Sequence, residues 1–335
     1  MPEPDFFNPE RIGQGIRQGL ASPKRRPEAH VEVAFFGGTF TGLDRARQAD
    51  LLAAVVPFWG ASLEKPVRGV RLSTRPDAIT QDGLVFLKER GVTTVELGVQ
   101  SMDDQVLEAA ERGHTADQTR RAAALIKSAG LRLGIQLLPG LPKEDDASRV
   151  RTQTEVLKLA PEDVRLYPLL VIRGTALAKR YHQGQYQPLS LERAVAICSA
   201  MYVQFTKAGI QVIRIGLQNN RDLDRNFLAG PYHPALGHLV KSEVYARAVI
   251  HTVSKNAARS NCPSLNVAPQ DISQALGHRR SNMKRLLESG FFTGLDIRPN
   301  PDLTPGRFRW LEKEYSVISE AMGYMRDHVS PSVTV

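Results

Sequence analysis

Cysteine is scarce in this sequence, and its scarcity limits the chemistry open to the chain. The 335 residues include two cysteines, Cys198 and Cys262, which lie far apart and form no CxxC pair. A disulfide framework or a cysteine-ligated metal site is therefore not indicated, and we expect both thiols to be small buried apolar groups. His233 and His238 have no third ligand at metal-site spacing, so we assign no metal to the chain.

Long apolar runs are missing as well. No uninterrupted run reaches the ~18 residues that a membrane-spanning helix needs. The first residues do not show the basic segment and apolar run of a signal peptide. With 42% hydrophobic and 24% charged residues, the composition is that of an ordinary globular protein. We therefore expect a cytoplasmic protein without a membrane partner.

Short β-branched runs alternate with amphipathic segments through the first half of the chain. This alternation is typical of strand–helix–strand units and predicts an α/β fold with a parallel, TIM-like sheet. After residue 191 the pattern changes to a long helix, a short strand at 212–215 and shorter mixed elements. We therefore divide the chain into a partial barrel over 1–215 and a small α+β extension over 216–335. The predicted barrel strands are 31–36, 70–73, 94–99, 131–137 and 164–170.

Polar and glycine residues follow the predicted barrel strands at their carboxyl ends. In a parallel barrel these ends meet at one mouth, so we expect the residues there to form a ligand pocket. The pair Gly37-Gly38 would free backbone N–H and C=O groups for a ligand, although an ordinary strand-ending turn is the simpler alternative. The other candidates at these ends are Thr39, Ser73, Arg75, Gln100 and Ser101.

Glu96 lies inside a predicted buried strand, where a carboxylate is costly unless it is paired or holds a polar ligand. Alternation along the strand puts Glu96, Gly98 and Gln100 on one face, which we expect to point into the barrel. Arg112 ends a helix, and either the helix dipole or a bound carboxylate would explain it. The sequence thus predicts a pocket suited to a ribose and an amino acid.

Four motifs in order carry a family resemblance: VAFFGGTFT at 33–41, RLSTRPD at 71–77, VELGVQS at 95–101 with RGHT at 112–115, and LYPLLVIRGT at 166–175. The set resembles the Elp3-type radical S-adenosylmethionine (radical SAM) proteins, in a short bacterial form without an acetyltransferase domain. The resemblance implies a (β/α)6 barrel that lacks its first strand here. It also implies S-adenosylmethionine bound by Gly37, Gly38, Thr39, Ser73, Arg75, Glu96, Gln100, Ser101 and Arg112.

The family's CxxxCxxC loop, which would bind a [4Fe–4S] cluster after the first strand, is not in this sequence. We therefore expect the 335-residue chain to take up no stoichiometric cluster and to make no radical as written. Two interpretations stay open. Either in-frame DNA upstream of Met1 encodes the missing strand and loop, or the chain is a cluster-free binding or scaffold protein.

The extension offers a hypothesis of another class. The net charge of the chain is +9, and residues 210–310 hold fourteen lysines and arginines against seven acidic residues. Two short predicted helices around Gly277 suggest a helix-turn-helix that binds nucleic acid, with a solvated basic helix as the alternative. Relatives of the Elp3 type suggest RNA, especially tRNA, as the partner. The four candidate phosphate contacts are Arg279, Arg280, Lys284 and Arg285.

Overall fold

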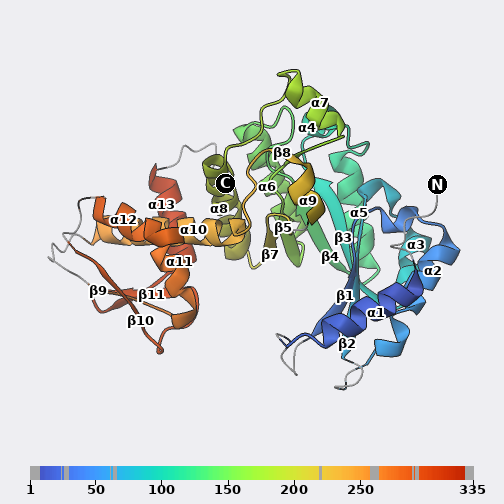
Figure 1. Cartoon of the computed structure of the whole chain (residues 1–335), viewed down its shortest axis with the longest axis horizontal. Coiled ribbons are helices and arrows are strands. Elements are labelled where there is room, and N and C mark those ends of the chain that lie inside the picture. The colour runs from blue at the N-terminus through green and yellow to red at the C-terminus, as the bar shows by residue number, and fades with distance from the viewer. Residues whose placement is uncertain are drawn as a thin grey trace. The chain divides into compact units, whose positions relative to one another are not determined.

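The computed structural model describes residues 8–23, 25, 30–60, 62, 66–218, 221–256, 264–288, 290 and 294–328 (Figure 1). The backbone divides into two compact units. The first unit consists of Met1–Leu107, Arg112–Gln136 and Pro161–Asp163. The second unit consists of Glu108–Glu111, Leu137–Ala160 and Val164–Val335.

The main sheet has six strands in the order β1-β2-β3-β4-β5-β7. β1 pairs in parallel with β2, and β2 pairs in parallel with β3. All but one residue of β2 and all but one of β3 are buried, which is typical of parallel strands covered on both faces. The strands are β1 (Val31–Phe35), β2 (Val67–Thr74), β3 (Val92–Gln100), β4 (Arg132–Leu137), β5 (Asp163–Leu166) and β7 (Gln211–Ile215).

This architecture confirms the predicted α/β fold with a curled, partial TIM-like sheet. The sixth strand, β7, comes from the segment that the sequence predicted as a separate short strand at 212–215. Figure 1 shows α3 and α5 beside β3, against which both pack.

The helices around β1–β3 begin at side-chain caps that can be read in the sequence. Asn8 accepts a hydrogen bond from the backbone N–H of Glu10, and Thr115 forms a reciprocal capping box with Gln118. These helices are α1 (Pro9–Leu20), α2 (Arg45–Ala53), α3 (Gln81–Glu89), α4 (Asp104–Ala109) and α5 (Ala116–Ser128), with 3₁₀ turns η2 (Phe40–Gly42), η3 (Val56–Phe58) and η4 (Pro76–Ala78).

The second unit has a core of its own. Phe308, Trp310 and Leu265 are buried there against α10 and α13. Its helices are α6 (Asp146–Leu159), α7 (Ala176–His182), α8 (Leu191–Lys207), α9 (Arg221–Asn226), α10 (Leu236–Lys255), α11 (Ile272–Leu276), α12 (Ser281–Glu288) and α13 (Val317–His328), with 3₁₀ turns η5 (Pro269–Asp271) and η6 (His278–Arg280).

Two small sheets complete the second unit. β6 (Val171–Ile172) pairs antiparallel with β8 (Phe227–Ala229). The other sheet has the order β10-β9-β11-β12, with β9 (Ser264–Val267), β10 (Asp296–Pro299), β11 (Arg307–Trp310) and β12 (Lys313–Ser316). For the segment 291–297 the sequence predicts a strand. Residues 291–293 lie outside the described part of the chain, residues 294 and 295 are not in a strand, and β10 begins only at Asp296 and runs on to Pro299. The Pro/Gly-interrupted sequence at 231–237 predicts a loop, but α10 already begins within it, at Leu236.

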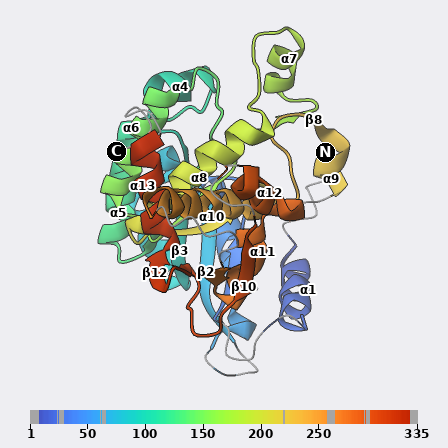
Figure 2. The same cartoon turned by 90° about the vertical axis from the view of Figure 1, so that its left-hand side faces the viewer.

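Helices α10 and α13 pack closely against each other (Figure 2). A Cβ atom on Gly323 of α13 would fall 2.2 Å from Cε1 of His251 on α10. His251 Nδ1 lies 2.8 Å from the Glu320 carboxylate, which fixes the ring at this crossing. Among the helices described, we find none with the length and apolar character needed to cross a membrane.

Candidate functional site

The predicted pocket residues all belong to the first unit, and the structure brings many of them to the carboxyl ends of β1–β3. Gly37 has a φ of +102°, a backbone conformation that favours glycine. Ser73 at the end of β2 has its Oγ 3.5 Å from the carbonyl oxygens of Phe35 and Gly38. The glycine turn and the end of β2 therefore meet, as the strand pattern predicted.

Gln100, Gly98 and Arg112 form the centre of the site. Gln100 ends β3 with a φ of 68°, a strained conformation for a residue other than glycine. A Cβ atom on Gly98 would lie 2.9 Å from Gln100 Nε2 and 3.9 Å from Arg112 Nη2. The absence of a side chain at Gly98 therefore makes the space in which the amide and the guanidinium lie together.

The polar atoms at this centre have few partners. Gln100 Oε1 and Arg112 Nε are both buried, and neither has a hydrogen bond within the described residues. Burial lowers the pKa of Arg112, and the nearby charge of Arg75 lowers it further. Because a buried unpaired donor or acceptor is costly, these atoms point to a ligand that carries both an anion and a hydrogen-bond donor.

Arg75 is engaged by protein groups. Its Nε and Nη2 donate to the two carboxylate oxygens of Asp77, at 2.9 Å and 2.8 Å. Nη2 also lies 3.3 Å from the carbonyl oxygen of Gly113, the residue after Arg112. Arg75 therefore holds the turn that carries Arg112, and it touches the predicted pocket from its rim.

Glu96 is fully buried and is paired with protein groups. Pairing is one of the two explanations that the sequence suggested for a carboxylate inside a buried strand. Arg71 Nη1 lies 3.0 Å from Glu96 Oε2, and Gln136 donates a short hydrogen bond to Glu96 Oε1. Arg71 also binds Asp163 of β5. Both carboxylate oxygens of Glu96 are thus occupied by protein donors beneath the Gln100–Arg112 centre.

The remaining candidates shape turns. Ser101 Oγ accepts a hydrogen bond from the backbone N–H of Asp103 at 3.2 Å. Thr39 accepts one through its carbonyl oxygen from the N–H of Gly42, at 2.9 Å. At the end of β2, the hydroxyls of Thr41 and Thr74 lie 2.5 Å apart and join the first two strand ends.

Sequence reasoning did not single out His114, which lies two residues after Arg112. Its Nε2 is 3.1 Å from the carbonyl oxygen of Val99, and its buried Nδ1 has no hydrogen-bond partner within the described chain. Burial lowers the pKa of His114, which favours the neutral form of the ring. The motif RGHT could have drawn attention to His114, because a positive charge on a histidine is unfavourable close to a buried arginine.

Within the described residues, no set of side chains suits an iron–sulfur cluster. Cys198 is buried in α8, where desolvation raises the pKa of its thiol to about 12. Cys262 lies outside the described residues. Across the ranges that the structure describes, we find no group of three His, Cys, Asp or Glu side chains arranged to bind a metal.

The four basic residues of the extension differ in how they are engaged. Arg285 Nη1 binds Glu243 at 2.7 Å, and Lys284 Nζ lies 3.7 Å from Glu288. Arg279 and Arg280 are exposed and have positive φ angles of 52° and 60°. Neither side chain has an ion pair within the described residues. The two helices around the turn, α11 and α12, have five and eight residues.

Comparison with protein families gives two adjacent matches. Residues 16–156 match the model of the Radical SAM superfamily, and residues 161–246 match the model of the Radical_SAM C-terminal domain. The first match contains all nine predicted pocket residues.

Individual relatives match about half of the chain. It is 32% identical over 190 residues to the tRNA uridine(34) acetyltransferase of Methanocaldococcus jannaschii, which covers 52% of this chain and 35% of that protein. It is 30% identical over 182 residues to Elongator complex protein 3 of Saccharomyces cerevisiae, with 49% and 33% covered. The chain therefore spans about a third of the length of these two relatives.

The solved structure of the archaeal Methanocaldococcus infernus Elp3 with an N-terminal deletion (1–46) is similar to this chain. The TM-score is 0.56 at 26% sequence identity, and the match covers 76% of this chain and 59% of that one. The match therefore covers more of the chain than the first unit alone.

Proposed function

We propose that this chain, which belongs to the radical SAM superfamily, binds S-adenosylmethionine at the ends of β1–β3 and contributes to the modification of RNA, tRNA above all. One observation carries the binding proposal. Gln100 Oε1 and Arg112 Nε are buried and have no hydrogen bond within the described residues, and both side chains lie beside Gly98, whose missing side chain makes room for the Gln100 amide. A ligand with a carboxylate and hydrogen-bond donors would satisfy both.

Each of these side chains would bind a different part of the ligand or support the residues that do. Arg112 would bind the methionyl carboxylate through charge-assisted hydrogen bonds. Gln100 Oε1 would accept from a ribose hydroxyl, and carbonyl groups of the Gly37-Gly38 turn would accept from the ammonium group. Ser73 and Thr39 would hold that turn, while Arg75 and Ser101 would hold the turns that carry Arg112 and Gln100. Glu96, through its bond to Arg71, would support the floor of the pocket.

S-adenosylmethionine bound to a [4Fe–4S] cluster supplies the radical chemistry of this superfamily. The residues described here do not fit such a cluster, and we derive no radical step from them. A protein that binds the nucleoside ligand without redox chemistry is therefore the alternative, and it uses the same pocket.

The RNA part of the proposal is supported by the relatives. Two proteins that match about half of this chain are a tRNA uridine(34) acetyltransferase and an Elongator complex protein 3. These matches do not identify the reaction. They cover the sheet that the superfamily shares, and the two relatives extend well beyond the matched region.

Calorimetry with S-adenosylmethionine and S-adenosylhomocysteine tests the pocket. We expect Gln100→Ala and Arg112→Ala each to weaken binding about tenfold to a hundredfold, the effect of losing a hydrogen bond to a charged group. Arg121→Ala, which removes an exposed charge from α5, is the control and should bind like the unchanged chain. Unchanged affinity in both pocket variants would refute these roles.

A second candidate function is phosphate binding by the basic turn of the extension. Arg279 and Arg280 extend from consecutive left-handed residues after Gly277, whose φ is also positive at 77°. Such conformations are costly for arginine and persist where a local structure enforces them. This turn therefore presents two guanidinium groups to solvent, and an RNA backbone is the partner that we propose for them. Arg285 and Lys284 would contribute less, since both already have acidic neighbours.

A further inference from the structure

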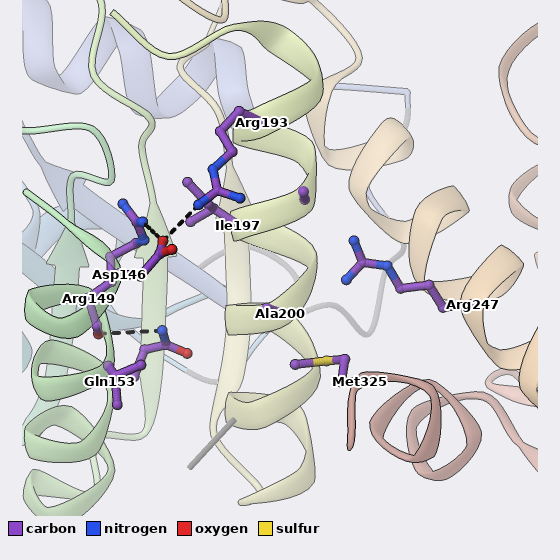
Figure 3. Close-up of a pocket in the computed structure, with 10 residues that line it drawn as sticks. Asp146, Arg149, Gln153, Arg193, Ile197, Ala200, Arg247 and Met325 are labelled. Carbon is purple, nitrogen blue, oxygen red and sulfur yellow. Dashed lines mark hydrogen bonds and ion pairs between the residues drawn. The ribbon is translucent and has the colours of Figure 1, made fainter. Parts of the chain in front are cut away.

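The arginines that line the small pocket within the second unit are paired with acidic side chains (Figure 3). Arg149 and Arg193 both contact Asp146, with Arg193 Nη2 2.7 Å from Asp146 Oδ1. Arg279 and Arg280 in η6 differ from them. Both are exposed, and neither has an acidic partner in the part of the chain that the structure describes. Their guanidinium groups are therefore open to an anion from outside the chain.

The turn that carries these two arginines is held by the helices beside it. Asn282 is 5% exposed, and its Nδ2 donates to the carbonyl oxygens of Ser242 on α10 at 2.7 Å and Gln274 on α11 at 3.0 Å. Gly277 begins the turn with a φ of 77°, and a Cβ atom there would lie 2.8 Å from the backbone nitrogen of Asn282. A ligand that binds the turn would therefore meet a backbone that is already ordered, which lowers the entropic cost of binding.

An aromatic ring lies next to the two arginines. His278 directly precedes Arg279 and is exposed. Its ring contacts the ring of His233 edge to face, with centroids 5.6 Å apart and an angle of 83° between the planes. Such a contact covers at most one face of each ring. The His278 ring thus keeps a face that His233 does not cover, and RNA bases stack on exposed rings of this kind.

His233 is itself fixed by a backbone hydrogen bond. Its Nδ1 accepts from the backbone N–H of Ala235 at 3.0 Å, just before α10 begins. An imidazole that accepts a hydrogen bond at Nδ1 is in its neutral form and carries its proton at Nε2. The contact between the two rings therefore rests on packing, and it holds His278 beside the two arginines.

The surroundings of the turn are positively charged. Burial lowers the pKa of His238 on α10, and the charges of His278 and Lys241 lower it further. Lys241 thus adds a basic side chain to the two exposed arginines. The region combines groups that bind phosphate with a ring on which a base can stack.

We propose that this turn binds an unpaired nucleotide of an RNA strand. The base would stack on His278, while Arg279 and Arg280 would bind the phosphates on either side of it. Paired RNA fits less well, because each base face in a helix is covered by its neighbours. This role of His278 rests on the phosphate binding proposed above for Arg279 and Arg280, and it adds a selection of unpaired over paired RNA.

Fluorescence titration of the full chain with a labelled single-stranded RNA, and with the same strand annealed to its complement, tests the role of His278. We expect His278→Ala to weaken binding of the single strand about fivefold to tenfold, the lower part of the range for losing one stacked base, and to leave binding of the duplex unchanged. His278→Phe keeps an aromatic ring without the imidazole nitrogens, so it should bind the single strand as the unchanged chain does. His182→Ala on α7 removes an exposed histidine elsewhere in the second unit and is the control.

The outcomes separate stacking from phosphate binding. Equal affinity of His278→Ala and the unchanged chain for the single strand would overturn the proposal, as would an equal loss for both RNAs or a loss in His278→Phe as large as in His278→Ala. In each of these cases Arg279→Ala combined with Arg280→Ala would still lower the salt dependence of binding, so the phosphate role would stand. If that double variant keeps the salt dependence, or if neither RNA binds, the phosphate role fails together with the stacking role.

Discussion

The Arg71 guanidinium binds both carboxylate oxygens of Asp163, with Nη1–Oδ1 at 2.8 Å and Nη2–Oδ2 at 2.7 Å. Both side chains are almost fully buried. We expect Asp163→Asn to lower the free energy of unfolding by about 1.5–3 kcal/mol, because it removes a charged hydrogen bond from the core. Glu96 at 3.0 Å and Glu32 at 3.6 Å remain as acidic partners of Arg71. Urea denaturation followed by circular dichroism measures this change.

Asp117→Asn is the matched control for Asp163→Asn. Asp117 pairs with Arg121 on the exposed face of α5, with Nη2 and Oδ2 2.8 Å apart. An exposed pair should change the unfolding free energy by less than about 1 kcal/mol. Equal effects of the two substitutions would mean that burial of the Arg71–Asp163 pair has no influence on its strength.

Gly98→Ala tests the space at the centre of the candidate site. The added Cβ would lie 2.9 Å from Gln100 Nε2, the far end of a side chain that can move. We therefore expect the fold to persist and S-adenosylhomocysteine affinity to fall about tenfold, as the Gln100 amide is displaced. Gly15→Ala in α1, where nothing lies within 4 Å, is the control. Calorimetry that finds equal affinity in both variants contradicts the assignment.

His114 should make stability depend on pH. Burial lowers its pKa below the ordinary 6.5, against a smaller opposing effect of its bond to Val99. The unfolded chain then takes up a proton that the folded chain resists. The contribution of the neutral His114 ring to the unfolding free energy is fully present above about pH 6.5. It is lost as the pH falls through the pKa that His114 has in the folded chain. His114→Gln should flatten the unfolding free energy over this range.

The exposed His182 on α7 provides the comparison for His114. His182→Gln should keep the slope of the unchanged chain, when urea midpoints are measured at several pH values below 7. An unaltered slope in His114→Gln, together with a functional fold, would assign the pH dependence to other groups.

The basic turn should bind RNA in a salt-dependent way. If Arg279 and Arg280 each contact a phosphate, changing both to Ala should reduce the slope of log affinity against log salt by about 1.4–1.8. Arg120 and Arg121 on α5, changed together to Ala, remove the same charge and should leave the slope as it is. Titration of a structured RNA at several salt concentrations measures it, and equal slopes for all three proteins would exclude a phosphate role for the turn.

Local signals in the sequence predicted most of the elements around the candidate site. The predicted strand at 31–36, which ends before Gly37, corresponds to β1 as observed. Side chains at strand ends were predicted as a pocket because parallel strands share an edge, and Gln100, Gly98 and Arg112 do meet.

Long-range pairing was beyond the reach of the sequence pattern. The partner of Arg71 lies 92 positions further along the chain, so a strand carboxylate such as Glu96 could be read equally as paired or as ligand-binding. The β11–β12 hairpin was missed for a different reason. Its turn residues Leu311 and Glu312 adopt left-handed conformations with φ of 48° and 64°, which usually call for Gly or Asn.

The contact between Gly323 and His251 restricts which residues homologous chains can carry at these two positions of the C-terminal region. Glycine inside a helix costs about 1 kcal/mol relative to alanine, so α13 accepts a local penalty in exchange for a short distance to α10. Any side chain at 323 would meet the imidazole at 2.2 Å and force the helices apart. Homologous chains with a larger residue at this position should therefore carry a smaller one at 251, and covariation of the two columns would mark which relatives share this helix pair.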